Sequence, residues 1–120
     1  MSILPRQAVA AFSLCEKIKS GLIWTTACAQ QAAAQEGLAR QGAMALVESL
    51  LGMVMGETLC AHRLTGDPAW DEVVRAMDKA MVMIRSGIPQ EAAYHLPRAL
   101  SLVTGIAKRA GEQLKARELL

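Results

Sequence analysis

The stretch from Met44 to His62, MALVESLLGMVMGETLCAH, constrains the fold of this chain more than any other. Its apolar residues recur every three or four positions, which is the period of a helix that buries one face. At about 100° per residue, one broad face carries Leu46, Leu50, Met53, Val54 and Ala61. We therefore predict a central helix from about Leu38 or Ala43 to Leu64, with this face in the core.

Glu57 falls in the middle of that predicted core face. An isolated carboxylate is costly to bury, so it needs a partner or must take up a proton. We expect an ion pair with an arginine of another helix, such as Arg75 or Arg98. The alternatives are a Glu57 satisfied by a second subunit and a Glu57 that acts as a general acid or base.

Gly52 and Gly56 fall on a second stripe of the same helix, together with Ser49. Each glycine inside a helix costs roughly 0.8–1 kcal/mol relative to alanine, so something close must compensate. We predict that a neighbouring helix packs its backbone tightly against this stripe.

The remaining segments also have helical patterns. The first helix is predicted from about Pro5 into the TTACAQQAAAQE segment; Gly21 could bend or split it, but the helix propensity of residues 27–36 favours Gly37 and Gly42 as the positions where it ends. Gly66, Asp67 and Pro68 form a helix end followed by a helix start, which predicts a helix from Pro68 to about Ser86.

A last helix is predicted from Pro89 to roughly Arg117, with a kink or break near Ala93 to Leu96 because Pro97 lies inside it. No segment alternates polar and apolar residues as a half-buried strand does. The expected fold is all-α: residues 1–120 form a single-domain antiparallel bundle of four to five helices.

Composition limits the classes of partner. Apolar residues make up 52% of the 120 residues, an excess that favours self-association into a homo-oligomer. The formal net charge is only +2 and like charges never form a long run, which argues against nucleic-acid binding. Glu48 and Glu57 interrupt the best apolar run, so we expect no membrane span.

Cysteine and histidine spacing indicates no metal site. Cys15, Cys28 and Cys60 form an odd set with no C-x-x-C pair and no secretory leader before them, which favours reduced thiols in a cytoplasmic protein. No Glu and His stand three apart as in the E-x-x-H pairs of di-metal bundles. We predict no metal, no cofactor and no catalytic residue.

The string His95-Leu96-Pro97-Arg98-Ala99-Leu100-Ser101 resembles the phosphorylated segment of histidine-phosphotransfer domains, which are four-helix bundles of this size. Arg98 at the third position after the histidine and Ser101 at the sixth match that family. Ala99 stands where the family usually has glycine, and Pro97 departs from its pattern. The family also places two further helices after the histidine, whereas 25 residues follow His95 here.

The leading functional hypothesis is a non-enzymatic helical module that binds protein or oligomerises, as a small subunit, an adaptor or a chaperone-like protein. The residues expected to take part in contacts are Ser49, Gly52, Gly56, Glu57, His95 and Arg98. The alternative is a histidine-phosphotransfer-like or acid–base protein that uses His95 or Glu57.

Overall fold

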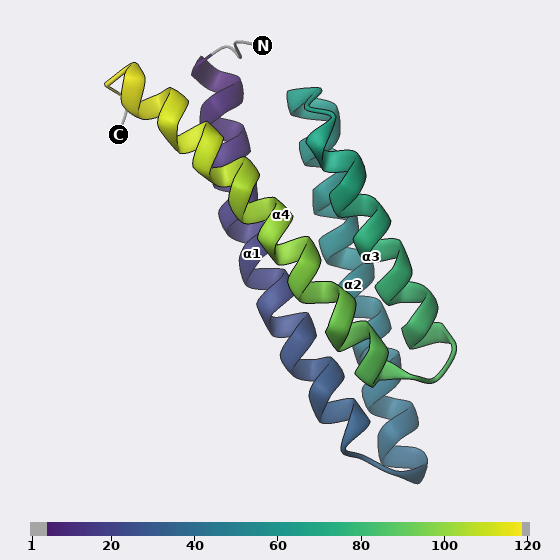
Figure 1. Cartoon of the computed structure of the whole chain (residues 1–120). Coiled ribbons are helices and arrows are strands. Elements are labelled where there is room, and N and C mark those ends of the chain that lie inside the picture. The colour runs from purple at the N-terminus through teal and green to yellow at the C-terminus, as the bar shows by residue number, and fades with distance from the viewer. Residues whose placement is uncertain (1–4, 119–120) are drawn as a thin grey trace.

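The computed structural model describes residues 5–118, and the helices within them are α1 (Pro5–Ala33), α2 (Gly37–Thr65), α3 (Ala69–Arg85) and α4 (Pro89–Ala116). The predicted all-α fold is confirmed, and the described residues form four helices. They lie side by side in one elongated bundle that measures 53 × 22 × 18 Å (Figure 1). α1 and α3 each pack against both α2 and α4, so α2 and α4 occupy opposite corners of the bundle.

Local sequence explains where the helices end. Gly66 adopts a left-handed φ of 65° and donates its N–H to the carbonyl of His62, which closes α2. Asp67 then accepts the N–H of Ala69 at 2.9 Å and begins α3. Gly87, with a φ of 80°, and Pro89 in the first turn of α4 make the next corner. The boundaries predicted at 65–68 and 87–89 are therefore confirmed.

Two residues that could have interrupted helices do not do so. α1 runs through Gly21, and α4 runs through Pro97 without a break. Pro97 removes one backbone donor, but its side chain is exposed and the packing of α4 on α1 and α3 outweighs the local loss. The predicted break near Ala93 to Leu96 is therefore wrong, whereas the kink given as its alternative stays a prediction.

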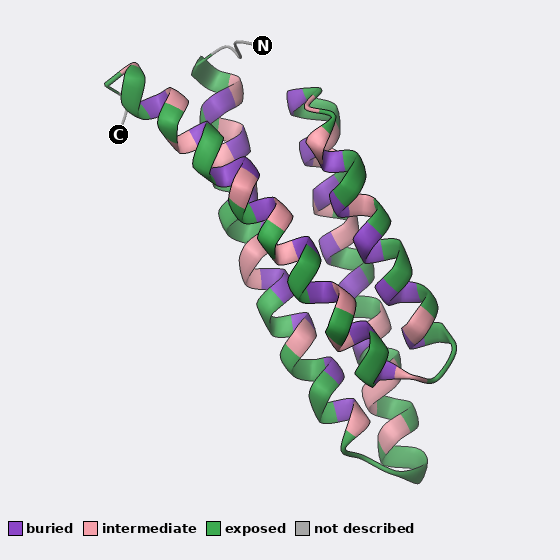
Figure 2. Ribbon diagram, in the orientation of Figure 1, coloured by how far each residue is buried: buried purple, intermediate pink, exposed green. Residues whose placement is uncertain are grey.

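The core is mostly aliphatic, and Trp70 is its largest fully buried side chain. Figure 2 shows the buried residues along the inner sides of all four helices. The residues that α2 buries are Val47, Leu51, Val54, Thr58, Ala61 and Thr65. The hydroxyls of Thr58 and Thr65 donate to the carbonyls of Val54 and Ala61, so their burial leaves no orphan donor.

The predicted core face of α2 is partly wrong, because the buried face is rotated around the helix axis from the predicted one. Val54 and Ala61 are buried as expected, but Leu46 is 73% exposed and Met53 is 68% exposed. Apolar residues surround most of α2, so their period indicates a helix without indicating which side faces the core.

Candidate functional site

One side of the bundle, formed by α1 and α2, is nearly free of charge. α1 has no charged residue between Lys19 and its end at Ala33, and α2 has only Glu48 and Glu57 between Arg40 and Arg63. α3 carries acidic and basic residues along its exposed surface, and α4 carries them near its two ends and at Arg98. We give the name α1–α2 face to a subset of the exposed uncharged residues of these helices, namely Trp24, Leu46, Ser49, Gly52, Met53 and Gly56.

A shallow groove of about 210 Å³ runs along this face between the two helices. Trp24 is 62% exposed and forms part of its wall. The lining residues are Lys17, Ile18, Gly21, Trp24, Leu50, Met53, Val54 and Glu57. The groove is thus mainly apolar, with one pair of opposite charges among its lining residues.

Gly21 sets the distance between α1 and α2 beneath the groove. A Cβ atom at this position would lie 2.7 Å from Cγ2 of Val54, closer than real carbon atoms approach. This is the tight glycine contact between helices that the sequence led us to expect at Gly52 and Gly56. The sequence contains a hint, because Gly21 lies inside an otherwise helical apolar pattern, but a glycine in that position also suits a bend.

The glycine stripe of α2 has no neighbour among residues 5–118. A Cβ at Gly52 or Gly56 would meet no atom within 4 Å, and Ser49 is exposed. The prediction that another helix of the same chain packs on this stripe is wrong, because the stripe lies on the outer side of α2. Its place in a contact with another molecule stays a prediction.

Glu57 pairs with a lysine rather than with an arginine. Nζ of Lys17 lies 2.9 Å from Oε1 of Glu57, and the two side chains are 65% and 36% exposed. Arg98 lies 4.0 Å from Glu72 instead, and Arg75 is exposed. The expected ion pair exists, but the predicted partners and the predicted burial are wrong, because Glu57 lies at the groove and not in the core.

The six residues predicted to take part in contacts do not form one cluster. Ser49, Gly52, Gly56 and Glu57 belong to α2, whereas His95 and Arg98 belong to α4 at the opposite corner of the bundle. His95 is half-buried and Arg98 is exposed. The structure therefore separates the α2 residues from the segment that resembles the phosphotransfer motif.

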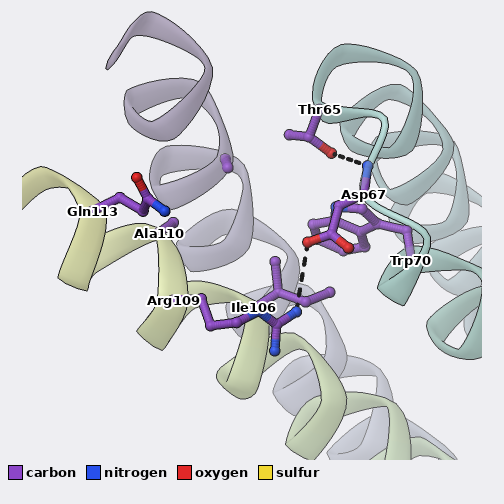
Figure 3. Close-up of a pocket in the computed structure, with 8 residues that line it drawn as sticks. Thr65, Asp67, Trp70, Ile106, Arg109, Ala110 and Gln113 are labelled. Atoms are coloured by element: carbon purple, nitrogen blue, oxygen red, sulfur yellow. Dashed lines mark hydrogen bonds and ion pairs between the residues drawn. The ribbon is translucent and has the colours of Figure 1, made fainter. Parts of the chain in front are cut away.

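A second pocket, which the sequence did not indicate, lies where the corner between α2 and α3 meets α1 and α4 (Figure 3). Its volume is about 90 Å³. The lining residues are Ala11, Thr65, Asp67, Trp70, Ile106, Arg109, Ala110 and Gln113. Predicting it would have required knowing which parts of three distant segments meet.

Polar groups converge on this corner pocket. Oδ2 of Asp67 lies 3.5 Å from Nη2 of Arg109, and the backbone N–H of Asp67 donates to the hydroxyl of Thr65 at 3.3 Å (Figure 3). Trp70 is 0% exposed, yet its Nε1–H has no hydrogen-bond partner. A buried donor without an acceptor is rare in folded proteins and marks the pocket as unusual.

The cysteines do not gather. Cys15 is buried, Cys60 is half-buried and Cys28 is exposed, and all three are free thiols. Burial raises the pKa of the Cys15 thiol to about 11, and the neighbouring Glu16 carboxylate adds to the shift. Among residues 5–118, no group of three or more His, Cys, Asp or Glu side chains is placed to hold a metal ion.

α2 is long and apolar enough to cross a membrane when judged by length and composition alone, with a mean hydropathy of 1.4 over its best window. Only 22% of that window is buried inside the bundle. The two carboxylates that argued against a span are paired, Glu48 with Arg85 and Glu57 with Lys17, each at 2.9 Å. α2 is therefore an apolar helix with most of its surface outside the core.

Comparisons with known proteins provide no relative from which a function could be inferred. No family model matches the chain, and no match is found among curated proteins or solved structures. The α1–α2 face and the corner pocket are thus the features from which function must be argued.

Proposed function

We propose that this chain is a non-enzymatic helical module that acts by binding protein, and that its partner at the α1–α2 face is a second copy of the chain. The observation that carries the proposal is the exposure of large apolar side chains on one side of the bundle. Trp24 is 62% exposed, Met53 is 68% exposed and Leu46 is 73% exposed. Contiguous apolar surface of this kind usually marks an interaction site.

The electrostatics of the face suit a copy of itself. The centre of the face is uncharged, and the charges at the groove, Lys17 and Glu57, are of opposite sign and already paired. Two copies related by a two-fold axis present the same surface to each other, so a face with a net charge would repel its copy. This face avoids that repulsion.

The small residues of α2 allow a close approach. Gly52 and Gly56 have open space above them, and Ser49 is exposed beside them. A helix of a second copy could therefore pack its backbone near that of α2, which would offset the cost of two glycines inside a helix. The proposal assumes that consecutive helices of the bundle run antiparallel. The short links between them, 34–36, 66–68 and 86–88, favour this arrangement.

Light scattering or sedimentation equilibrium of the wild type and of Met53→Lys tests the proposal. We expect a dimer or higher state of the wild type at micromolar concentration and a monomer for Met53→Lys, because a lysine would be buried without a partner. Val82→Lys is the matched control, since Val82 is 57% exposed but lies on α3. That variant should assemble as the wild type does.

A wild type that remains monomeric at ~100 μM, well above the affinity of a specific interface, would overturn the proposal. So would a Val82→Lys variant that dissociates as Met53→Lys does, because the effect would then not belong to the α1–α2 face.

The alternative function has less support. Glu57 is not the buried, unpaired carboxyl group that the alternative requires, because it lies 2.9 Å from Lys17 and its side chain is 36% exposed. α4 is the last helix within residues 5–118, whereas the phosphotransfer resemblance implies two helices after His95. A cytoplasmic location remains an expectation from the cysteines and is consistent with the proposed module.

A further inference from the structure

The α1–α2 face carries an exposed leucine beside the apolar groove. Leu46 is 73% exposed, and it precedes Met53, which lines the groove, by seven residues. Seven residues are about two turns of a helix, so both side chains lie on the same side of α2. A projecting apolar side chain and an apolar hollow therefore lie next to each other on one surface.

The groove has room for a side chain of this size. Its volume is about 210 Å³, whereas a cavity of about 150 Å³ can already hold a benzene molecule. Most of its lining is apolar, so a leucine of another molecule would lose contact with water there at little polar cost. The groove thus suits an aliphatic side chain.

Two contacts fix how α1 lies along α2. Nζ of Lys17 lies 2.9 Å from Oε1 of Glu57, and a Cβ atom at Gly21 would meet Val54. These contacts run in opposite directions along the two helices. Trp24 follows Gly21 by three residues, so it lies beside the part of α2 that is about three residues before Val54.

A single two-fold axis brings the leucine of one copy to the groove of another. Leu46 and Val54 lie four residues before and after Leu50, about 6 Å away along the helix on either side. An axis perpendicular to the face, over the groove and level with Leu50, exchanges these two levels and places α1 of each copy over α2 of the other. Leu46 of one copy then reaches Val54 and Met53 of the second.

The same axis gives the other groups of the face suitable neighbours. Trp24 is almost level with the axis, so it comes to lie over the part of the second α2 where the small side chain of Ser49 is exposed. The ion pair of Lys17 and Glu57 comes to lie opposite residues 41–47 of the second α2, which carry no charge. No like charges are brought together.

We propose that the groove of each copy binds Leu46 of a second copy, about a two-fold axis that passes over the groove at the level of Leu50. The proposal rests on the self-association proposed above, and it adds the side chain that fills the groove and the symmetry that relates the copies. Leu46 and Met53 contact each other twice, once on each side of the axis. These two residues therefore determine which surface a second copy recognises.

Oppositely charged variants test which side chains meet. Leu46→Asp and Met53→Lys should each be monomeric, because each would bury two charges without partners in its own dimer. In an equal mixture, the introduced carboxylate meets the introduced ammonium, and the other groove receives an unchanged Leu46. Sedimentation equilibrium should then give a dissociation constant for the mixture at least about tenfold below that of either variant alone.

Leu46→Lys mixed with Met53→Lys is the matched control, because the same positions then carry charges of the same sign. This mixture should remain monomeric. Both positions are exposed in the single chain, so the substitutions should leave the fold intact. Circular dichroism of each variant checks this.

Nuclear magnetic resonance of the wild type tests the contact without any substitution. In a mixture of ¹³C-labelled and unlabelled copies, isotope-filtered nuclear Overhauser spectra record only contacts between copies. The methyl groups of Leu46 should give cross-peaks to the methyl group of Met53. The indole protons of Trp24 should give cross-peaks to the β-protons of Ser49.

The outcomes distinguish this arrangement from the self-association on which it rests. A monomeric wild type would overturn both. If the wild type is a dimer that Met53→Lys dissociates, the absence of association in the oppositely charged mixture, or of contacts between Leu46 and Met53 across copies, would overturn the arrangement alone. Association of the control mixture would also overturn it, because the sign of the charges would then not matter.

Discussion

The ion pair between Lys17 and Glu57 lies at the groove, where both side chains reach water. Pairs of this kind contribute about 0.2–1 kcal/mol, because solvent screens them and ordering two long side chains costs entropy. The pair therefore positions two side chains at the α1–α2 face more than it stabilises the fold.

A double-mutant cycle with Glu57→Gln and Lys17→Met should give a coupling energy of ~0.5 kcal/mol, measured by denaturant unfolding at neutral pH. The coupling should fall by about half or more in 1 M salt, where the Debye length shrinks to about 3 Å, similar to the 2.9 Å that separates the two charges. A coupling above ~2 kcal/mol that survives high salt would mean that the pair is desolvated in solution, for example under a partner.

Because of Cys15, the free energy of unfolding should depend on pH in the alkaline range. Burial raises the pKa of its thiol to about 11, so the unfolded chain loses this proton at a lower pH than the folded chain does. The thiol's contribution is fully present below about pH 9 and is lost as the pH rises toward 11. One pH unit of difference corresponds to about 1.4 kcal/mol.

We expect the wild type to lose about 2 kcal/mol of unfolding free energy between pH 8 and pH 10.5 relative to Cys15→Ala. Denaturant melts at both pH values measure the difference. Cys28→Ala, which removes an exposed thiol, should show the same pH dependence as the wild type. If Cys15→Ala does so as well, the buried thiol is not the group responsible.

At the level of single helices, α2 shows why periodicity can locate a helix and misassign its inner face. Val47, Leu51 and Val54 face the core, yet Leu46 and Met53 beside them are just as apolar and face outward. The helix ends were predictable because Gly66, Asp67 and Pro68 act through their own backbone. The inner face depends on which helices pack against α2, and that is not encoded locally.

Gly21→Ala should destabilise the protein by on the order of 1 kcal/mol. The added methyl would lie 2.7 Å from a methyl of Val54, and overpacking costs ~1–3 kcal/mol, more than the ~0.8–1 kcal/mol gained in helix propensity. Gly52→Ala is the control, because open space surrounds that position and only the gain in propensity applies.

Thermal or denaturant melts of both variants measure the contrast. Combining Gly21→Ala with Val54→Ala should remove the clash, so the two changes should not add. A more stable Gly21→Ala protein would show that α1 and α2 lie farther apart than the structure has them.

For the whole molecule, the all-helical fold could be predicted from the sequence, but neither the corner pocket nor the α1–α2 face could. The corner pocket needs Ala11, Thr65, Trp70 and Arg109 to meet, and these come from segments that the chain separates widely. The α1–α2 face needs the knowledge that Trp24 and Met53 line one groove. The corner pocket and the α1–α2 face both arise from the packing of distant segments. The composition indicated only that the chain has more apolar residues than its core can bury.

The two tryptophans report on different parts of the molecule, since Trp24 is 62% exposed and Trp70 is 0% exposed. An aqueous quencher such as iodide reaches the first indole and is excluded from the second. A partner on the α1–α2 face would shield Trp24 and abolish quenching, whereas unfolding would expose both rings and increase it. The protein's own fluorescence thus distinguishes assembly from loss of structure without any attached label.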